Sequence, residues 1–375
     1  MADESVYWSN PFAEGGVKTM YAVIMAGGKG TRFWPRSVEK RPKQLLNIVG
    51  RRSMLQQTVA RIGDLLPAEN VLVVAGEAHG EELRRQLAEL PAENIFLEPV
   101  GRNTAACIGL AALLVQHRDP SAVMVVLPAD HLITDEDLFL STVRAAAAMA
   151  RRQPALITLG VRPTSPQTGY GYIEAGEEVD KVQGHTFYKV TSFHEKPDGK
   201  RAKDYLGKGN FFWNSGMFVW QAKTILLEIE RCLPGLYSDL IRLKPFLDTD
   251  GFHQAINQTY PDLESISIDY GVMEKADNVL MIPANFGWND LGTWASMAQI
   301  WPKDNQDNAH QGEIMVMESR GNVVFCQDKL CVLFGVNDLV VVDTNEALLV
   351  CPVDRAQDIG KILDLMKQRG MERYL

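Results

Sequence analysis

The stretch from Ala26 to Lys43 combines glycines with positive charge. It begins Ala-Gly-Gly-Lys-Gly-Thr-Arg, and Lys43 follows within a Pro-Lys-Gln segment. Glycines let backbone N–H groups approach phosphate oxygens closely, and Arg32 and Lys43 add charge where phosphates would lie. The spacing fits neither the GxxxxGK[ST] loop nor the GxGxxG dinucleotide fingerprint. A tight turn with solvated charges is the alternative, but the two basic positions and a preceding apolar strand favour a nucleoside triphosphate site.

Two acidic residues far apart in the chain have the setting of metal ligands. Asp130 follows the apolar run Ala122 to Leu127, so it lies just past the C-terminal end of an expected strand, where ligands of open α/β sheets bind. Asp290 lies in a turn with two tryptophans and two glycines. A carboxylate facing a triphosphate needs a cation between them, and Mg²⁺ is the usual one. Each acid also fits a capping role, so the metal hypothesis requires that the two converge.

Three further segments carry polar groups suited to a sugar or a base. Glu195 and Lys196 offer an acceptor for sugar hydroxyls and a cation for a phosphate, although such pairs are common on surfaces. Asn214 lies between aromatic residues, either as part of a sugar site or at the start of an ordinary strand. Glu98 precedes a loop and an expected helix start. Its carboxylate could accept both N1–H and N2–H₂ of guanine, a donor pair that adenine lacks.

Strands and helices alternate from Tyr21 to Gly160, which predicts a doubly wound parallel sheet. Beyond Trp301, short Val- and Leu-rich runs recur between Gly, Asn and Asp residues. That spacing predicts a small all-β module, which could be a sandwich, a barrel or a solenoid. A helix is expected to close the chain, from Ala356 to Met371.

Composition narrows the class of protein. The 375 residues are 46% hydrophobic and 23% charged, as in ordinary globular proteins. A net charge of −9 argues against a nucleic-acid binder, so the local basic cluster indicates a focused anion site. The five cysteines are scattered and none forms a CxxC pair, which argues against disulfides or zinc and favours the cytoplasm. No apolar run approaches the roughly 20 residues of a membrane helix, so no membrane partner is expected.

Taken together, eight segments resemble the sugar-nucleotide pyrophosphorylases, in the order found in that family. They lie between Tyr21 and Val350 and read AGGKGTRFWP with RPKQ, EPVGRNTAA, LPADH, TGYGYI, FHEKP, WNSGMF, SIDYGVMEKA and GWNDLGTW. Two positions depart from the family pattern. Phe33 stands where Leu is frequent, and His194 replaces the Val of FVEKP while the Glu and Lys remain.

The resemblance, which is greatest to the members that use mannose 1-phosphate, implies a reaction. GMP would pass from GTP to α-D-mannose 1-phosphate with Mg²⁺, giving GDP-mannose and pyrophosphate by in-line attack of the sugar phosphate on the α-phosphorus. By motif, the catalytic residues would be Arg32, Lys43, Asp130 and Lys196, and the metal ligands Asp130 and Asp290. The sugar phosphate would meet Gly171, Glu195, Lys196 and Asn214. The nucleotide site would comprise Ala26, Gly27, Gly28, Gly30, Thr31, Arg32, Lys43 and Asn103, with Glu98 added on the chemical argument above.

The resemblance also implies an architecture. A Rossmann-like, mixed and mostly parallel sheet would form a nucleotidyltransferase domain over residues 20–300. Residues 301–375 would form a left-handed β-helix with a terminal helix, used in homodimer contacts, and residues 1–19 a disordered leader. Enzymes for another base or sugar phosphate, and a non-catalytic paralogue that senses GDP-mannose, remain alternatives. The paralogue should have lost Asp130, Asp290 or Lys43, and all three are present. A Rossmann dehydrogenase is disfavoured by the loop spacing.

Overall fold

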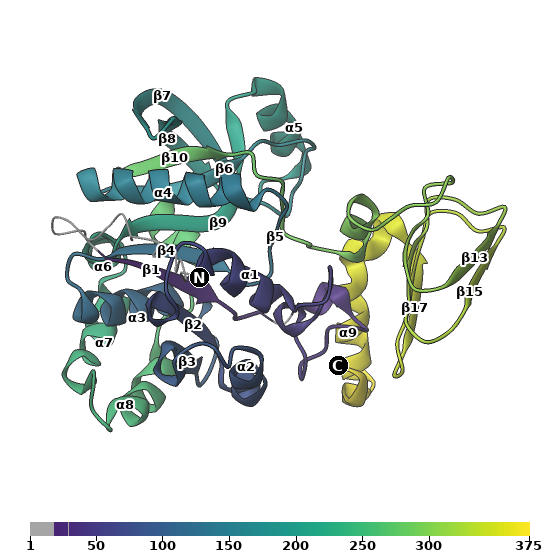
Figure 1. The fold of residues 1–375 in the computed structure, drawn as a ribbon, viewed down its shortest axis with the longest axis horizontal. Helices are drawn as coiled ribbons and strands as arrows, with labels where there is room; N and C mark the ends of the chain where they lie inside the picture. The colour runs from purple at the N-terminus through teal and green to yellow at the C-terminus, as the bar shows by residue number, and fades with distance from the viewer. Residues whose placement is uncertain (1–18, 29) are drawn as a thin grey trace, which may run out of the picture.

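The structure is a computed structural model that describes residues 19–28 and 30–375. The expected leader therefore lies outside the described residues, apart from Thr19, and so does Lys29 of the glycine loop. A large α/β body and a narrower C-terminal β part lie side by side, with the terminal helix between them (Figure 1). No helix in the described part of the chain is long and apolar enough to cross a membrane.

The body is built on a nine-stranded mixed sheet with the order β3-β2-β1-β4-β9-β6-β10-β8-β7. The strands are β1 (Met20–Met25), β2 (Val71–Gly76), β3 (Ile95–Glu98), β4 (Val123–Pro128), β6 (Leu156–Val161), β7 (Tyr172–Val182), β8 (His185–His194), β9 (Phe211–Gln221) and β10 (Val279–Ala284). Strands β1 to β4 run parallel, as do β6 and β10, whereas β9 runs antiparallel to both β4 and β6. The predicted Rossmann-like mixed sheet is confirmed.

Helices cover both faces of this sheet. They are α1 (Met54–Gly63), α2 (Gly80–Gln86), α3 (Asn103–Arg118), α4 (Glu136–Arg152), α5 (Gly199–Lys208), α6 (Ala222–Cys232), α7 (Pro234–Ile241) and α8 (Phe252–Thr259). Because successive strand residues point to opposite faces, Ala22 and Ile24 of β1 pack in one core with α1 and α4. Tyr21 and Val23 pack in the other core with α3 and α6. Burial on both faces explains the continuous apolar strands in the sequence.

The C-terminal part coils between two small sheets. One contains β12 (Ala309–Gln311), β14 (Val323–Cys326), β16 (Leu339–Asp343) and β17 (Leu348–Pro352), and the other β13 (Ile314–Met317) and β15 (Cys331–Phe334). Strands that are not consecutive pair in parallel, such as β12 with β14 and β13 with β15. The chain thus alternates between the sheets as it rises, which identifies a β-helix-like solenoid among the three predicted options.

The terminal helix α9 (Ile359–Gln368) turns back onto the body and packs near the glycine loop. Trp34 donates its indole N–H to the backbone oxygen of Tyr374 at 2.7 Å. A third core contains Phe33 from the loop together with Phe325 from β14 and Met366 from α9. The β-helix is therefore fixed to the segment that carries Arg32 and Lys43.

A short ladder joins two loops at the edge of the body. Strand β5 (Leu132–Ile133) pairs antiparallel with β11 (Trp288–Asn289), and Leu132 lies opposite Asn289. Asp130 precedes β5 by two residues and Asp290 follows β11 directly. This ladder brings the two acidic motifs together.

Candidate active site

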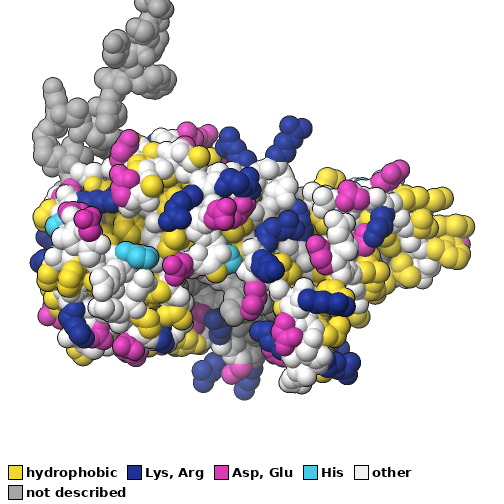
Figure 2. Space-filling model, turned by 90° about the horizontal axis from the view of Figure 1, so that it is seen from below, with side chains coloured by type: hydrophobic (Ala, Val, Ile, Leu, Met, Phe, Trp, Pro, Cys, Tyr) yellow, Lys and Arg dark blue, Asp and Glu magenta, His cyan; other side chains and the backbone are white. Residues whose placement is uncertain are grey.

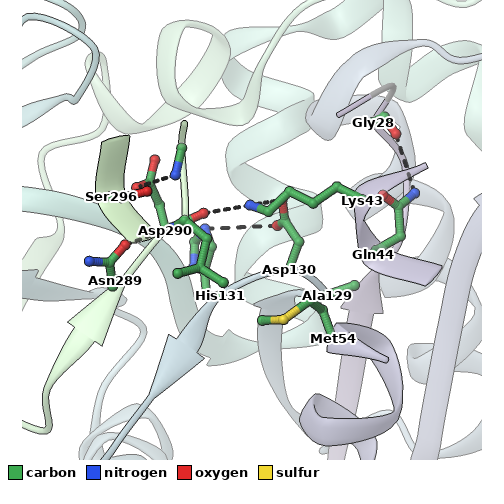
Figure 3. A network of polar contacts seen from close by, with 12 residues as sticks. Gly28, Lys43, Gln44, Met54, Ala129, Asp130, His131, Asn289, Asp290 and Ser296 are labelled. Carbon is green, nitrogen blue, oxygen red and sulfur yellow. Dashed lines mark hydrogen bonds and ion pairs between the residues drawn. The ribbon is translucent and has the colours of Figure 1, made fainter. Parts of the chain in front are cut away.

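The glycine loop leaves β1 and is held against the segment that contains Lys43. Gly30 has φ +56°, and a Cβ there would lie 2.5 Å from the Cβ of Lys43, so this position requires glycine. Gln44 donates its side-chain amide to the backbone oxygen of Ala26 at 2.7 Å. It also donates to the backbone oxygen of Gly28 at 3.3 Å (Figure 3). Gln44, which the sequence analysis did not single out, therefore fixes the shape of the loop.

Lys43 joins the two acidic motifs. Its buried ammonium donates to Oδ2 of Asp130 at 2.9 Å and to the backbone oxygen of Asp290 at 2.6 Å (Figure 3). Burial alone would raise the pKa of the Asp130 carboxyl, but the positive charges of Lys43 and His131 hold that pKa below its usual value. Asp130 is therefore kept as an anion beside the glycine loop.

Asp290 is oriented from its other side. Tyr170 donates its hydroxyl to Oδ1 of Asp290 at 2.6 Å, and the N–H of Gly292 donates to the same oxygen at 3.0 Å. Leu291, which lies between Asp290 and Gly292 in the chain, has φ +47°. That backbone conformation costs a non-glycine residue energy and is often found at functional sites. Tyr170 lies within the TGYGYI segment, but nothing in that segment predicted its contact with Asp290.

Two adjacent cavities meet at this point. The smaller, of about 250 Å³, is lined by the loop residues Gly30, Thr31 and Arg32 and by Lys43, Asp130, His131 and Asp290. The larger, of about 690 Å³, is lined by Arg32, Tyr170, Trp213 and Asp290 among others. Since Arg32 and Asp290 line both cavities, they lie where two substrates placed in them would meet.

The residues expected at the sugar form a second cluster. A Cβ on Gly171 would collide with Oε2 of Glu195 and lie 3.2 Å from the Cβ of Asn214, so these three residues are in contact. Lys196 pairs with Oε1 of Glu195 at 3.2 Å and has φ +47°. Oε2 of Glu195 is buried without a hydrogen-bond partner. A buried acceptor of that kind suits a ligand hydroxyl.

Asp269 is a member of this cluster that the sequence analysis missed. Asn214 donates its side-chain N–H to Oδ1 of Asp269 at 2.8 Å, and accepts from the backbone N–H of Gly216 at 3.1 Å. The amide of Asn214 is therefore fixed in one orientation. Burial and the nearby charge of Glu195 raise the pKa of Asp269 to about 6. Asp269 belongs to the SIDYGVMEKA segment, one of the eight segments that resemble the family, and that membership is the sequence feature that could have indicated it.

Glu98 lies on the opposite side of the glycine loop. Its Oε1 accepts a hydrogen bond from the buried Tyr260 hydroxyl, and its Oε2 lies 3.6 Å from where a Cβ of Gly27 would be. Burial raises the pKa of Glu98, and the bond from Tyr260 opposes that rise. Asn103, at the start of α3, has φ +65° and its side chain accepts from the N–H of Thr104. Glu98 therefore borders the glycine loop, whereas Asn103 lies at the start of the helix that follows β3.

The donor set is compatible with the expected metal ion. The described residues contain no group of three or more His, Cys, Asp and Glu side chains that could hold a metal by themselves. Asp130 and Asp290 offer two carboxylates beside the phosphate loop. Mg²⁺ is typically bound by one or two carboxylates together with substrate phosphates and water, so this pair fits Mg²⁺ better than a metal that needs a full protein cage.

Fold and site together define a nucleotidyltransferase: a glycine loop after the first strand, with two carboxylates at the adjoining edge of a mixed sheet. The chain belongs to the nucleotidyl transferase family, whose model matches residues 21–307. The model described as the MannoseP isomerase/GMP-like beta-helix domain matches residues 312–366.

Relatives and solved structures agree with this assignment. The chain is 40% identical over 357 residues to mannose-1-phosphate guanylyltransferase RfbM of Salmonella typhimurium, covering 94% of this chain and 73% of the relative. It is 38% identical over 355 residues to a mannose-1-phosphate guanylyltransferase of Escherichia coli, covering 94% and 75%. A crystal structure titled mannose-1-phosphate geranyltransferase, from Thermus thermophilus, superposes with a TM-score of 0.84 at 30% identity, covering 93% of this chain and 99% of that one.

Proposed function

We propose that this protein transfers GMP from GTP to α-D-mannose 1-phosphate, giving GDP-mannose and pyrophosphate. The observation that carries the reaction type is the convergence of Lys43, Asp130 and Asp290 beside the glycine loop. The choice of substrates is supported by the relatives named mannose-1-phosphate guanylyltransferase, at 35–40% identity. A regulatory paralogue that only binds GDP-mannose would not need Lys43, Asp130 and Asp290 to converge in this way.

The triphosphate lies along the glycine loop in this proposal. The backbone N–H groups of Gly27, Gly28, Gly30 and Thr31 contact its oxygens, and Arg32 balances the charge that develops on the leaving pyrophosphate. Mg²⁺ held by Asp130 and Asp290 would supply additional positive charge to the phosphates. Lys43, fixed by two hydrogen bonds, holds its charge in place before the substrates arrive.

The sugar phosphate occupies the other side of the site. Lys196 binds its phosphate, while Glu195 and Asn214 bind sugar hydroxyls beside Gly171. The phosphate oxygen attacks the α-phosphorus in line with the departing pyrophosphate, and no covalent enzyme intermediate forms. Catalysis consists of positioning two anions against their mutual repulsion and of electrostatic stabilisation, as in other phosphoryl transfers.

Glu98 selects the base. Its carboxylate accepts the N1–H and N2–H₂ donors of guanine, and the hydroxyl of Tyr260 holds it in place. Asn103 completes the nucleotide site at the start of α3. Because adenine cannot offer this donor pair, it would leave the buried carboxylate with Tyr260 as its partner and without the two donors of the base, which is a basis for rejection.

The assignment is tested by pyrophosphate release from every pairing of GTP, ATP, UTP and dTTP with mannose, glucose and galactose 1-phosphates. Turnover should require Mg²⁺, and GTP with mannose 1-phosphate should give the highest kcat/KM. Preference for another pair would overturn the substrates but keep the reaction. Absence of turnover with every pair, together with tight GDP-mannose binding, would favour the regulatory paralogue.

A homodimer formed through the β-helix is part of the proposal. The β-helix exposes a set of apolar side chains on β13, β15, β17 and the adjoining turn: Met315, Met317, Leu330, Val332, Phe334, Leu348 and Val350. Figure 2 shows hydrophobic side chains gathered over this narrow end of the molecule. Exposed apolar side chains that gather at one end of a molecule commonly mark a protein interface.

We also propose the division of the chain into a nucleotidyltransferase domain, residues 20–300, and a β-helix domain with its terminal helix, residues 301–375. The polar stretch near residue 305 separates the two patterns of sheet. A cytoplasmic location is supported by the cysteines, since all five are free thiols in the structure.

A further inference from the structure

A cavity of about 500 Å³ lies where the body meets the β-helix, and none of the proposed catalytic or substrate-binding residues lines it. This volume is in the range of small-molecule sites. Its charged and amide side chains come from three parts of the chain: Arg36, Arg41 and Asn47 from the segment after the glycine loop, Glu82, Arg85 and Gln86 from α2, and Gln311 and Gln327 from the β-helix. Figure 2 shows Lys and Arg side chains around this junction.

The lining has an excess of positive charge. Glu82 is the one acid among the lining residues, and it already accepts hydrogen bonds from Arg85 at 2.5 and 2.7 Å and from Gln86 at 2.7 Å. Arg36 forms no ion pair with a carboxylate in the described part of the chain. Glu82 balances the charge of Arg85, so the charges of Arg36 and Arg41 remain as the excess in the lining.

Arg36 is buried with an unused donor. The residue is 7% exposed, and its guanidinium carbon lies 4.4 Å from the centre of the Phe325 ring. Its Nη2 donates to the backbone and side-chain oxygens of Asn47 at 3.0 and 2.6 Å, but Nη1 is buried without a partner. Burial and the charge of Arg41 lower the pKa of Arg36 to about 10. Buried guanidinium donors are normally paired, and phosphate is among the anions that guanidinium groups bind through charge-assisted hydrogen bonds.

We propose that this cavity is an effector site for a small phosphorylated metabolite, whose phosphate lies between Arg36 and Arg41. The remaining volume beside Gln311 and Gln327 accommodates the organic part of the ligand. The site is distinct from the catalytic cavities, because the residues that line it and those that line the two cavities at the active site do not overlap.

The same segment connects this cavity to the catalytic residues. The N–H of Arg36 donates to the backbone oxygen of Phe33 at 3.0 Å, next to Arg32. Arg41 pairs with Val38 through the backbone and precedes Lys43 by two residues. A ligand that holds both arginines restrains the backbone between Arg32 and Lys43, so its binding is coupled to the binding of GTP.

The first test is a calorimetric titration with inorganic phosphate of the full chain saturated with GDP-mannose, which fills the catalytic cavities. Wild-type protein should bind phosphate, and Arg41→Met and Arg36→Met should weaken that binding about tenfold or more, because each removes a charge-assisted contact. Glu82→Gln should tighten it. Arg84→Met, on the same helix but outside the cavity, is the matched control and should leave it unchanged.

Arg41 is exposed, so its variant keeps the test valid if Arg36→Met fails to fold. Absence of phosphate binding to the saturated wild type, or equal binding by wild type and Arg41→Met, would overturn the site. The second test compares the effect of phosphate on the KM for GTP in these two proteins. For a coupled site, phosphate should change the KM for GTP of the wild type about fivefold more than that of Arg41→Met. An identical response would overturn the coupling.

Discussion

The Lys43 ammonium lies 2.9 Å from Oδ2 of Asp130, although 87 residues separate them in the chain. The same ammonium lies 2.6 Å from the backbone oxygen of Asp290, which is 247 residues further along. One buried lysine therefore joins the glycine loop, the end of β4 and the turn after β11. The position of the positive charge is fixed by the fold, which is the property that electrostatic catalysis requires.

Replacing Lys43 by Met should lower kcat by about 10²–10³-fold, the range found when one fixed electrostatic contact to a transition state is removed. The methionine keeps most of the length of the side chain but leaves Asp130 and the phosphates without their cation. Initial rates of pyrophosphate release at saturating GTP and mannose 1-phosphate measure the effect. Lys40→Met, an exposed lysine of the same segment, is the control and should retain full activity. A Lys43→Met enzyme with near-normal kcat would contradict the role of this residue.

The motifs that carry the candidate site residues could be predicted from the sequence, but the contacts that orient those residues could not. Asp130 was placed correctly after a buried strand because the apolar run before it is unambiguous. Its approach to Asp290 depends on the pairing of β5 with β11, two strands of two residues each. Strands of that length have no periodicity to read, so only the motif resemblance suggested that the acids meet.

The same limit explains the missed residues. Tyr170 and Asp269 act through single side-chain bonds to residues more than fifty positions away, and no local pattern encodes such a partner. Strand β7 was not predicted because all of its positions from Glu177 to Lys181 are exposed, so its sequence lacks the alternation of a half-buried strand. The hydrogen bond from Trp34 to Tyr374, which lies beyond the end of α9, likewise spans 340 residues.

Replacing Glu98 by Gln should reduce the preference for GTP over inosine triphosphate, which lacks the N2 amino group. A glutamine offers a single acceptor oxygen, so one of the two guanine donors loses its partner. The expected loss is about 1–3 kcal/mol in kcat/KM for GTP, or roughly 10–100-fold, with a smaller loss for inosine triphosphate. Competition assays with both nucleotides give the ratio. Glu93→Gln, an exposed acid shortly before Glu98, is the control. An unchanged ratio in the Glu98 variant would exclude Glu98 as the guanine reader.

Asp269 makes the stability of the protein depend on pH in an unusual direction. Its pKa is raised from 3.8 to about 6, so the folded chain holds this proton more tightly than the unfolded chain. The carboxyl therefore favours folding most below pH 4, and this contribution is lost as the pH rises through 6. Asp269→Asn removes the titration while keeping an oxygen that can accept from Asn214.

The variant should be more stable than the wild type by roughly 1–3 kcal/mol at pH 7, with a difference that falls toward zero near pH 4. Urea unfolding at both pH values measures it, and Asp262→Asn, an exposed acid nearby, serves as the control. Equal stability of Asp269→Asn and wild type at pH 7 would show that the carboxylate is well solvated or paired there. Activity should nevertheless fall, since the charge near the sugar hydroxyls is lost.

The exposed apolar face of the β-helix predicts the effect of adding charge to it. Phe334 is 64% exposed on β15 and lies beside Met317 of β13 in the paired register. If two copies bury this face against each other, Phe334→Glu places a carboxylate in the contact, and burying an unpaired charge opposes association strongly. Sedimentation should show wild type at twice the chain mass of 41.8 kDa and the variant at the single mass. Leu227→Glu, at a 61% exposed position on α6, adds the same charge elsewhere and should leave the mass unchanged. A variant that stays dimeric would place the contact on another surface.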